Sequence, residues 1–256
     1  MEEKSLCIKI NSDAYPERLK SNLRPISDVH QYITNMDKIT LIENIYFNTL
    51  TRNHISELSK LYKEWFPVNY SPEYFHKIFS TIEINKGIAI GAFYSFNGNS
   101  YIIGAILCEY KNDFAFRHSC PYDLINRCCL SKFINPFEYG YISTIGVCDE
   151  FRRYGLGTKL LNELIKNVSL RRQCIAIYLH VIEYNQSALK FYFTNNFDEV
   201  NTIYGYYYID EVRYNAKVFL KVLSENVKIF NNTEYNYKDY TKMITKKFKS
   251  IICCEF

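Results

Sequence analysis

The sequence predicts an α/β domain with a mixed central sheet. Of the 256 residues, 48% are apolar and 17% are aromatic, which is enough for a full hydrophobic core. Segments with the composition of strands follow one another along the chain, with amphipathic helices between them. This order is typical of α/β domains. One of these strands leads directly into a short basic turn, a Gly-x-Gly pair and an apolar helix.

Apolar periodicity and turn residues place each element along the chain. The expected order is a strand over 41–51, helices over 53–66 and 71–82, strands over 87–96 and 99–110, a long loop over 111–137, a strand over 140–147, a helix over 156–168, a strand over 174–182, a helix over 185–196, and strands over 197–209 and 216–223.

Caps and turns support several of these elements. Asn53 is the expected cap of the first helix, and Ser71 and Pro72 suit the cap and first position of the second. The Asn97-Gly98 pair predicts a tight hairpin turn between the two strands that flank it.

Composition excludes several classes of protein. A net charge of +4, scattered along the chain, does not favour a nucleic-acid partner. The nine cysteines are irregularly spaced and lack zinc-ligand spacing, so we expect no metal site. The first residues lack the apolar core of a signal peptide, and no run reaches the roughly 18 apolar residues of a membrane span. We therefore expect a reduced, cytosolic protein.

The glycine pair Gly155 and Gly157 suggests an anion site. Amides at a helix N-terminus carry partial positive charge, and glycines let a phosphate approach them closely. Arg152 and Arg153 add charge to this turn. The spacing fits neither a Rossmann fingerprint nor a P-loop, since position 160 is Leu. The alternative is a helix start whose glycines serve only packing.

Residues 42–223 resemble the GNAT acetyltransferase superfamily. The resemblance rests on "YISTIGV", "FRRYGLGTKLL", "IYLHV" and an N-x-x-A-x-x-F-Y helix that begins at Asn185. It implies the GNAT acyl-CoA N-acyltransferase fold, in which a splayed strand pair of the mixed sheet holds acetyl-CoA and helices flank the sheet. The implied cofactor-binding residues are Ile145, Gly146, Val147, Arg152, Arg153, Tyr154, Gly155, Leu156, Gly157, Thr158, Asn185, Tyr192, Phe193, Thr194 and Asn195.

Within that superfamily, the chain is similar to the N-terminal acetyltransferases. "EWFPVNY" and "GYYY" carry this resemblance, and Trp65, the long loop and a basic-apolar tail favour the NatF branch over the NatE branch. The resemblance implies that protein N-termini are substrates, with a retained Met followed by a large or basic residue. It also implies action on membrane proteins at the cytosolic face of the Golgi, with the cytosol as the alternative location. Asn69 departs from the acid found in NatF enzymes, so the substrate preference can differ.

Two side chains are candidate catalytic residues. His180 lies within the apolar strand "YLHVI", where a histidine satisfied by its neighbours is the simpler interpretation. The resemblance instead makes it a general base, with Tyr141 as a second base acting through water. A free Tyr titrates near ~10, so Tyr141 needs either a lowered pKa or a proton relay. Tyr192 would hold or protonate the leaving thiolate, and its alternative role is packing.

The peptide-binding residues implied by the resemblance form two aromatic walls. They are Phe66, Pro67, Val68 and Tyr70 in one loop, Ser143 in the splayed strand, and Tyr206, Tyr207 and Tyr208 in a late strand. Strand propensity alone also explains the tyrosine run.

The chain divides into three parts: an extension over 1–42, the acetyltransferase domain over 43–223, and a tail over 224–256. The tail places aromatic and aliphatic residues on one helical face and lysines around the others, which is typical of a helix on an anionic membrane surface. The Cys253-Cys254 pair suits palmitoylation. A solvated tail is the alternative.

Two rival functions remain open on this fold. One is a NatE-like enzyme or a lysine (histone) acetyltransferase, although the bulky aromatic walls suit a chain end better than a lysine side chain. The other is an inactive acyl-CoA or peptide-binding module, against which the combination of Tyr141, His180 and the glycines argues. The sequence gives no oligomeric state.

Overall fold

The computed structural model describes residues 43–66, 69–111, 138–209 and 211–223. Seven strands form one mixed sheet in the order β1-β2-β3-β4-β5-β7-β6. The strands are β1 (Ile45–Thr49), β2 (Gly87–Phe96), β3 (Asn99–Lys111), β4 (Glu138–Val147), β5 (Cys174–Ile182), β6 (Asp198–Ile209) and β7 (Val212–Val222). All pairings are antiparallel except that of β4 with β5. The predicted mixed sheet is therefore confirmed.

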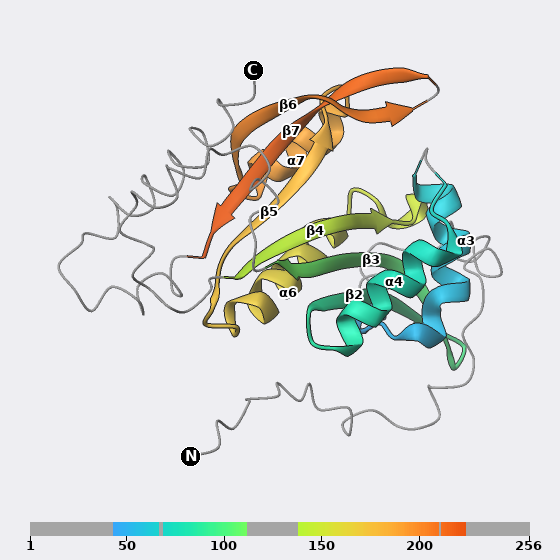
Figure 1. The fold of residues 1–256 in the computed structure, drawn as a ribbon. Coiled ribbons are helices and arrows are strands. Elements are labelled where there is room, and N and C mark those ends of the chain that lie inside the picture. Colours follow the sequence, from blue (N-terminus) through green and yellow to red (C-terminus); the bar gives the residue numbers. More distant parts are fainter. Residues whose placement is uncertain (1–42, 67–68, 112–137, 210, 224–256) are drawn as a thin grey trace, which may run out of the picture.

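Helices cover both faces of the sheet (Figure 1). They are α3 (Ile55–Trp65), α4 (Pro72–Glu83), α6 (Leu156–Ser169) and α7 (Gln186–Thr194), with short 3-10 turns η4 (Arg52–His54) and η7 (Asp149–Phe151). The helices α3 and α4 lie on one face, and α6 lies on the other. The α6 helix buries Leu156, Leu160, Leu161, Leu164 and Val168, as its apolar spacing predicts.

The second helix begins as its sequence predicts, whereas the first does not. Ser71 caps α4 by accepting the backbone N–H of Tyr74, and Pro72 is its first residue. The prediction of Asn53 as a cap is wrong, because Asn53 lies inside η4. Thr51, two residues earlier, is the N-cap of this turn instead, and its backbone N–H donates to Nδ1 of His54 over 2.9 Å.

The hairpin of β2 and β3 is confirmed. Asn97 and Gly98 both have positive φ angles, of 49° and 73°, as a two-residue turn between twisted strands requires. The predicted loop over 111–137 falls almost entirely outside the described residues, as do the extension over 1–42 and the tail over 224–256.

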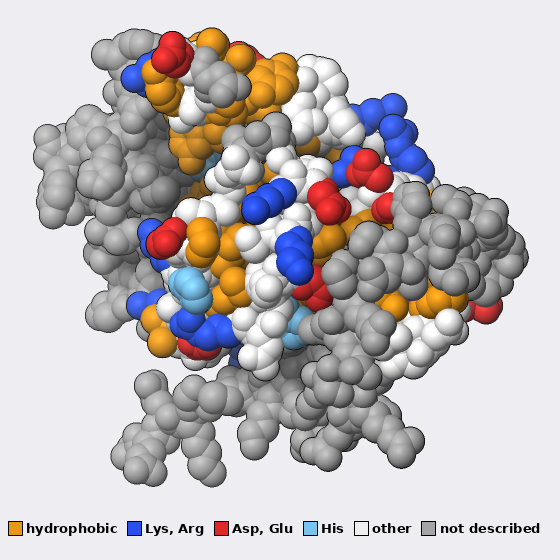
Figure 2. All heavy atoms as spheres, turned by 90° about the vertical axis from the view of Figure 1, so that its right-hand side faces the viewer, with side chains coloured by type: hydrophobic (Ala, Val, Ile, Leu, Met, Phe, Trp, Pro, Cys, Tyr) orange, Lys and Arg blue, Asp and Glu red, His pale blue; other side chains and the backbone are white. Residues whose placement is uncertain are grey.

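The hairpin of β6 and β7 extends past the body of the molecule (Figure 1). Figure 2 shows hydrophobic side chains gathered at this end, whereas charged side chains of both signs are interspersed over the rest of that face. Tyr204, Tyr206, Tyr208 and Val212 contribute large exposed hydrophobic side chains here. Among the described residues, no helix has the length and apolar character needed to cross a bilayer.

Candidate active site

The strands β4 and β5 separate in the middle of the sheet. Their parallel pairing ends at Tyr141 and Tyr178, but β4 continues to Val147 and β5 to Ile182. The pairing of β4 with β3 shifts register here, and Ser143 lies opposite no residue of β3. Such a bulge increases the local bend and twist of a strand. The expected splayed strand pair is thus present, with its inner backbone groups facing a gap.

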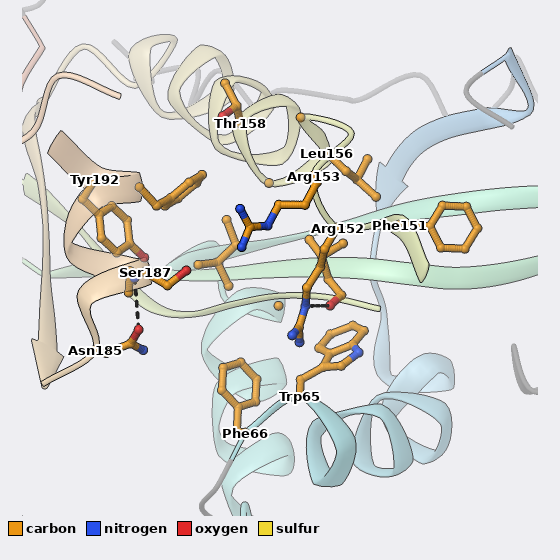
Figure 3. A pocket seen from close by; sticks show the side chains of 17 residues that line it. Trp65, Phe66, Phe151, Arg152, Arg153, Leu156, Thr158, Asn185, Ser187 and Tyr192 are labelled. Atoms are coloured by element: carbon orange, nitrogen blue, oxygen red, sulfur yellow. Dashed lines mark hydrogen bonds between the residues drawn. The ribbon is translucent and has the colours of Figure 1, made fainter. Parts of the chain in front are cut away.

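A cavity of about 520 Å³ lies beside the splayed end of β4 (Figure 3). Trp65 and Phe66 lie on one side of it, and Asn185 and Tyr192 on another. Its lining includes eleven of the predicted cofactor-binding residues: Ile145, Gly146, Val147, Arg152, Arg153, Gly155, Leu156, Gly157, Thr158, Asn185 and Tyr192. The structure therefore brings together most of the set that the motif predicts.

The N-terminus of α6 opens into this cavity. Gly155 is the cap residue, with a φ of 75° and no side-chain cap hydrogen bond. A Cβ built on Gly155 meets no atom within 4 Å, so the space beside it is open. The first amides of a helix have no partner within the helix. This end of α6 therefore offers unpaired donors and partial positive charge to a pyrophosphate.

Gly157 serves packing as well. A Cβ at this position would lie 3.3 Å from the ring of Phe191 in α7, so glycine permits the close approach of α6 and α7. The phosphate and packing interpretations of the glycine pair are therefore compatible.

The two arginines of the turn differ in role. Arg152 is held by the chain itself, since its Nε donates to the carbonyl of Val147 over 3.0 Å and its Nη2 lies 2.8 Å from Oδ1 of Asp149. Arg153 has a positive φ of 68°, and its guanidinium extends into the middle of the cavity (Figure 3). Arg153 is consequently the better placed cation for a phosphate.

Four predicted cofactor-binding residues do not line the cavity. Tyr154 packs against the core, and Phe193 packs on Phe219 with ring centroids 4.9 Å apart. The side chains of Thr194 and Asn195 bond to the carbonyl of Phe191 and finish α7. Their assignment to the cofactor stays a prediction.

Six lining residues were not among the predicted cofactor-binding residues: Phe66, which was assigned to the peptide, Ala188 and Phe191 of the N-x-x-A-x-x-F-Y motif, and three residues outside these sets. Phe151 belongs to η7, Ser187 to the first turn of α7, and Trp65 to the end of α3. None carries a local signal for this role, because the fold brings them to the cavity from separate elements.

Tyr141 and His180 meet at the point where the strands separate. Tyr141 pairs with Tyr178 across the two strands, and His180 lies two residues further along the same face. Nδ1 of His180 lies 3.3 Å from the hydroxyl of Tyr141, whereas its Nε2 is buried without a hydrogen-bond partner among the described residues.

Burial sets the protonation of this pair. It lowers the pKa of His180 to about 4, so the imidazole is neutral at pH 7. Burial, together with neighbouring Tyr206 and Tyr207, raises the pKa of Tyr141 well above its usual range. Tyr141 therefore has a raised and not a lowered pKa in this structure, which favours the relay, in which the phenol accepts a proton as it gives its own to His180.

Tyr206 is a third member of this cluster that sequence reasoning treated only as part of a wall. Its ring stacks on His180, with centroids 4.6 Å apart and planes inclined by 23°. Its hydroxyl lies 3.5 Å from Nδ1 of His180. No sequence pattern distinguishes Tyr206 from the tyrosines beside it.

The predicted peptide-binding residues are partly assembled. Phe66 and Tyr70 pack edge to face with centroids 5.5 Å apart. Burial raises the pKa of Tyr207, and the neighbouring Tyr206, Tyr70 and Tyr184 raise it further, so Tyr207 lies close to Tyr70. Tyr208, in contrast, is 67% exposed and lies under the guanidinium of Arg213. Pro67 and Val68 fall outside the described residues.

Ser143 connects the site to an acid. Its hydroxyl donates to Oε1 of Glu109 over 3.4 Å, and Nζ of Lys111 lies 2.6 Å from Oε2 of the same carboxylate. Glu109 is directly opposite Tyr141 in the pairing of β3 with β4, so both side chains share the face that carries His180. The carboxylate side chain is 17% exposed.

Tyr192 links the cavity to the tyrosine cluster. Its ring lines the cavity, and burial followed by the proximity of Tyr207 raises its pKa above the usual range. The phenol therefore keeps its proton at neutral pH and can donate a hydrogen bond toward a leaving sulfur. Among the described residues, no cluster of His, Cys, Asp and Glu has the arrangement of a metal site.

Comparison with known proteins agrees with this geometry. Residues 55–197 match the acetyltransferase (GNAT) family. The chain is 31% identical over 179 residues to N-alpha-acetyltransferase 60 of Danio rerio, covering 69% of each chain. The structure of Arabidopsis thaliana NAA60 in complex with acetyl-CoA superposes with a TM-score of 0.58 at 25% identity, over 70% of this chain and 98% of that one. Arabidopsis thaliana Naa50 in complex with the bisubstrate analogue CoA-Ac-MVNAL gives a TM-score of 0.51 at 26% identity, over 70% and 98%.

A cavity at a splayed strand pair, with an anion-binding helix end and a buried Tyr-His pair, defines an acyltransferase that uses acetyl-CoA. The chain belongs to the GNAT acetyltransferase family and, within it, to the N-alpha-acetyltransferases.

Proposed function

We propose that the enzyme acetylates the α-amine of protein N-termini that begin with a retained Met, followed by a large or basic residue. The observation that carries this proposal is the Tyr141–His180 pair, whose Tyr141 lies near Tyr207. Tyr207 in turn neighbours Tyr70, on which Phe66 packs. Aromatic walls accommodate a large apolar first side chain, and their hydroxyls can bond the peptide backbone. The Naa50 analogue, whose peptide part begins with Met, supports the same choice.

The residues of the site divide the chemistry between them. An α-amine has a pKa near ~7.7–8.0 and must lose a proton before or during attack on the thioester that acetyl-CoA supplies. The hydroxyl of Tyr141 takes this proton while passing its own to Nδ1 of the neutral His180. Backbone N–H groups of the splayed β4 stabilise the developing oxyanion. Tyr192, protonated at neutral pH, donates a hydrogen bond to the leaving sulfur.

Glu109 supports the preference for a basic second residue. Its largely buried carboxylate lies on the same face as Tyr141, where the neighbouring rings are neutral. A lysine that follows the first Met would find an opposite charge here, in competition with Lys111. Asn69, which is exposed, supplies no charge of its own.

A mass-spectrometric assay tests the reaction. Purified enzyme and acetyl-CoA are incubated with peptides that begin Met-Leu, Met-Lys or Ser-Glu, each with an internal lysine. Acetylation of the α-amine of the two Met peptides is expected. Acetylation of the internal lysine alone would favour a lysine acetyltransferase, and cofactor binding without transfer would leave only a binding module.

For the cellular setting, we propose that the enzyme acts on membrane proteins at the cytosolic face of the Golgi. The support is the basic, amphipathic pattern of residues 224–256, which lie outside the described residues. Deletion from Ser224 onward is expected to leave peptide acetylation intact and to release the protein into the cytosol. An unchanged location would contradict the membrane role of the tail.

A further inference from the structure

The strand β6 carries two extra residues opposite its partner. Ile203 pairs with Ala216 and Tyr207 pairs with Tyr214, so four steps along β6 correspond to two along β7. Tyr204, Gly205 and Tyr206 therefore share a single opposite residue, Asn215. Gly205 adopts a positive φ of 62°, a conformation that glycine reaches without strain.

The side chain of Asn215 occupies the centre of this bulge. Its Oδ1 accepts the backbone N–H of Gly205 over 3.0 Å, and its Nδ2 donates to Oε2 of Glu183 over 3.0 Å. The backbone carbonyl of Asn215 also accepts the N–H of Glu183 over 3.0 Å. Asn215 thus ties the bulge of β6 to the residue that follows β5, three positions beyond His180.

The bulge places Tyr206 over the candidate base. The residue next to the anchored Gly205 is Tyr206, whose ring stacks on His180 and whose hydroxyl approaches Nδ1. Tyr206 is nevertheless 46% exposed, so packing on its outer side does little to hold it. The hydrogen bond at the adjacent amide is therefore one of the restraints on its backbone, together with the contact of Nη1 of Arg213 with the carbonyl of Gly205 over 3.5 Å.

We propose that Asn215 and Glu183 are positioning residues, which hold the bulge of β6 so that Tyr206 covers His180 and keeps the imidazole in place for the proton relay. This inference rests on the proposed function, because the relay belongs to the transfer reaction. Neither residue touches the reacting atoms. Their effect reaches the site through the backbone of Gly205, since a small displacement of a positioned group lowers the rate strongly.

A polarity exchange between the two side chains tests the proposal. Asn215→Asp sets a second carboxylate against Glu183 and removes the donated hydrogen bond, so kcat is expected to fall about 10–100-fold. Glu183→Gln alone keeps an acceptor for Nδ2 of Asn215 and is expected to have a small effect. In the double variant, the new amide donates to the new carboxylate, which still accepts the N–H of Gly205, and kcat should return to within about 2-fold of the parent enzyme.

Thr202→Val provides the matched control. It removes another cross-strand hydrogen bond of the same hairpin, from Nζ of Lys217 to the Thr202 hydroxyl, at a paired position just outside the bulge. A purely structural role for Asn215 predicts that Asn215→Asp and Thr202→Val act alike, on thermal stability and not on kcat. KM for acetyl-CoA should not change in any of these variants.

A measurement on the free enzyme separates this proposal from the function on which it rests. An NMR titration follows His180, whose ring is faced by Tyr141, Tyr178 and Tyr206. Displacement of Tyr206 in Asn215→Asp exposes the imidazole, so its pKa should move upward from about 4 and return in the double variant. An unmoved titration, or a double variant as impaired as Asn215→Asp, overturns the proposal. If the pKa of His180 rises in Asn215→Asp but the enzyme acetylates no α-amine, the proposed function is contradicted and the positioning role remains supported.

Discussion

The indole ring of Trp65 lies directly on the backbone of Gly146. A Cβ built at Gly146 would approach Cδ2 of that ring to 2.9 Å and would overlap its Cε3. Both residues line the acetyl-CoA cavity, so one wall of the cavity depends on the absence of a single methyl group from β4.

Substitution of Gly146 should therefore displace the wall of the cavity. Gly146→Ala is expected to push Trp65 into the cofactor space, to lower the free energy of unfolding by about 1–3 kcal/mol and to raise KM for acetyl-CoA. Calorimetry and steady-state kinetics measure the two effects. Gly140→Ala is the control, because its added Cβ would contact Cys108 and Ile177 instead of the cavity. An equal rise of KM in both variants would contradict this account.

Removal of either member of the Tyr-His pair should impair chemistry and spare cofactor binding. Tyr141→Phe deletes the hydroxyl that bridges the amine and His180, and His180→Gln replaces the imidazole with an amide that cannot take up a proton, so each is expected to lower kcat by about 10²-fold or more. Titration calorimetry should give an unchanged Kd for acetyl-CoA, since neither residue lines the cavity. Full activity of Tyr141→Phe would exclude the relay.

The stability of the enzyme should fall as pH rises through the titration of Glu57. This carboxyl accepts the N–H of Ile102 at Oε1, and its Oε2 is buried without a partner among the described residues. Burial raises its pKa to about 7, above the ~4.3 of an unfolded chain. The folded state then binds more protons between these values, so stability decreases with increasing pH across that window.

Glu57→Gln keeps the acceptor and removes the charge. At pH 8 it should raise the free energy of unfolding by about 1–3 kcal/mol, and it should flatten the pH dependence between pH 5 and 8. Urea unfolding at several pH values measures this. Glu64→Gln, an exposed position on the same helix, is the comparison and should leave the slope in place.

The charge of Glu109 should appear in peptide selectivity. Glu109→Gln is expected to lower kcat/KM for a Met-Lys peptide several-fold while leaving a Met-Leu peptide nearly unaffected. Lys111, the ion-pair partner of Glu109, provides a control with the opposite expected effect. Lys111→Met removes the competing ammonium group and should raise kcat/KM for the Met-Lys peptide relative to the Met-Leu peptide. Equal losses on both peptides would assign Glu109 to the structure of the sheet rather than to recognition.

Local features of the fold could be predicted because short-range chemistry determines them. The Asn97-Gly98 turn, the Ser71 cap and the glycine-led start of α6 each depend on neighbouring residues, and all are confirmed. Asn53 failed as a cap because a 3-10 turn that begins one residue earlier satisfies the same backbone.

The missed features depend on contacts between distant segments. Trp65 contacts Gly146, which lies more than eighty positions further along the chain, and no periodic pattern in the sequence predicts this contact. The bulge at Gly205 could not be predicted for another reason. Strand periodicity alone assigns successive tyrosines of β6 to alternate faces of the sheet. The two extra residues of β6 break this alternation locally, and the tyrosine that contacts His180 is Tyr206.

The short pairing of β4 with β5 divides the sheet into two halves, β1 to β4 and β5 to β6, that are joined by a few paired residues. Among the described residues, β4 pairs with β5 only from Glu138 to Tyr141, and beyond this stretch the two strands run on without pairing to each other. A substrate that bonded to the facing edges of β4 and β5 would bridge the two halves of the sheet. Hydrogen exchange along Ile142–Val147 and Leu179–Ile182 should slow most when both substrates are bound, because each then clamps the same two halves.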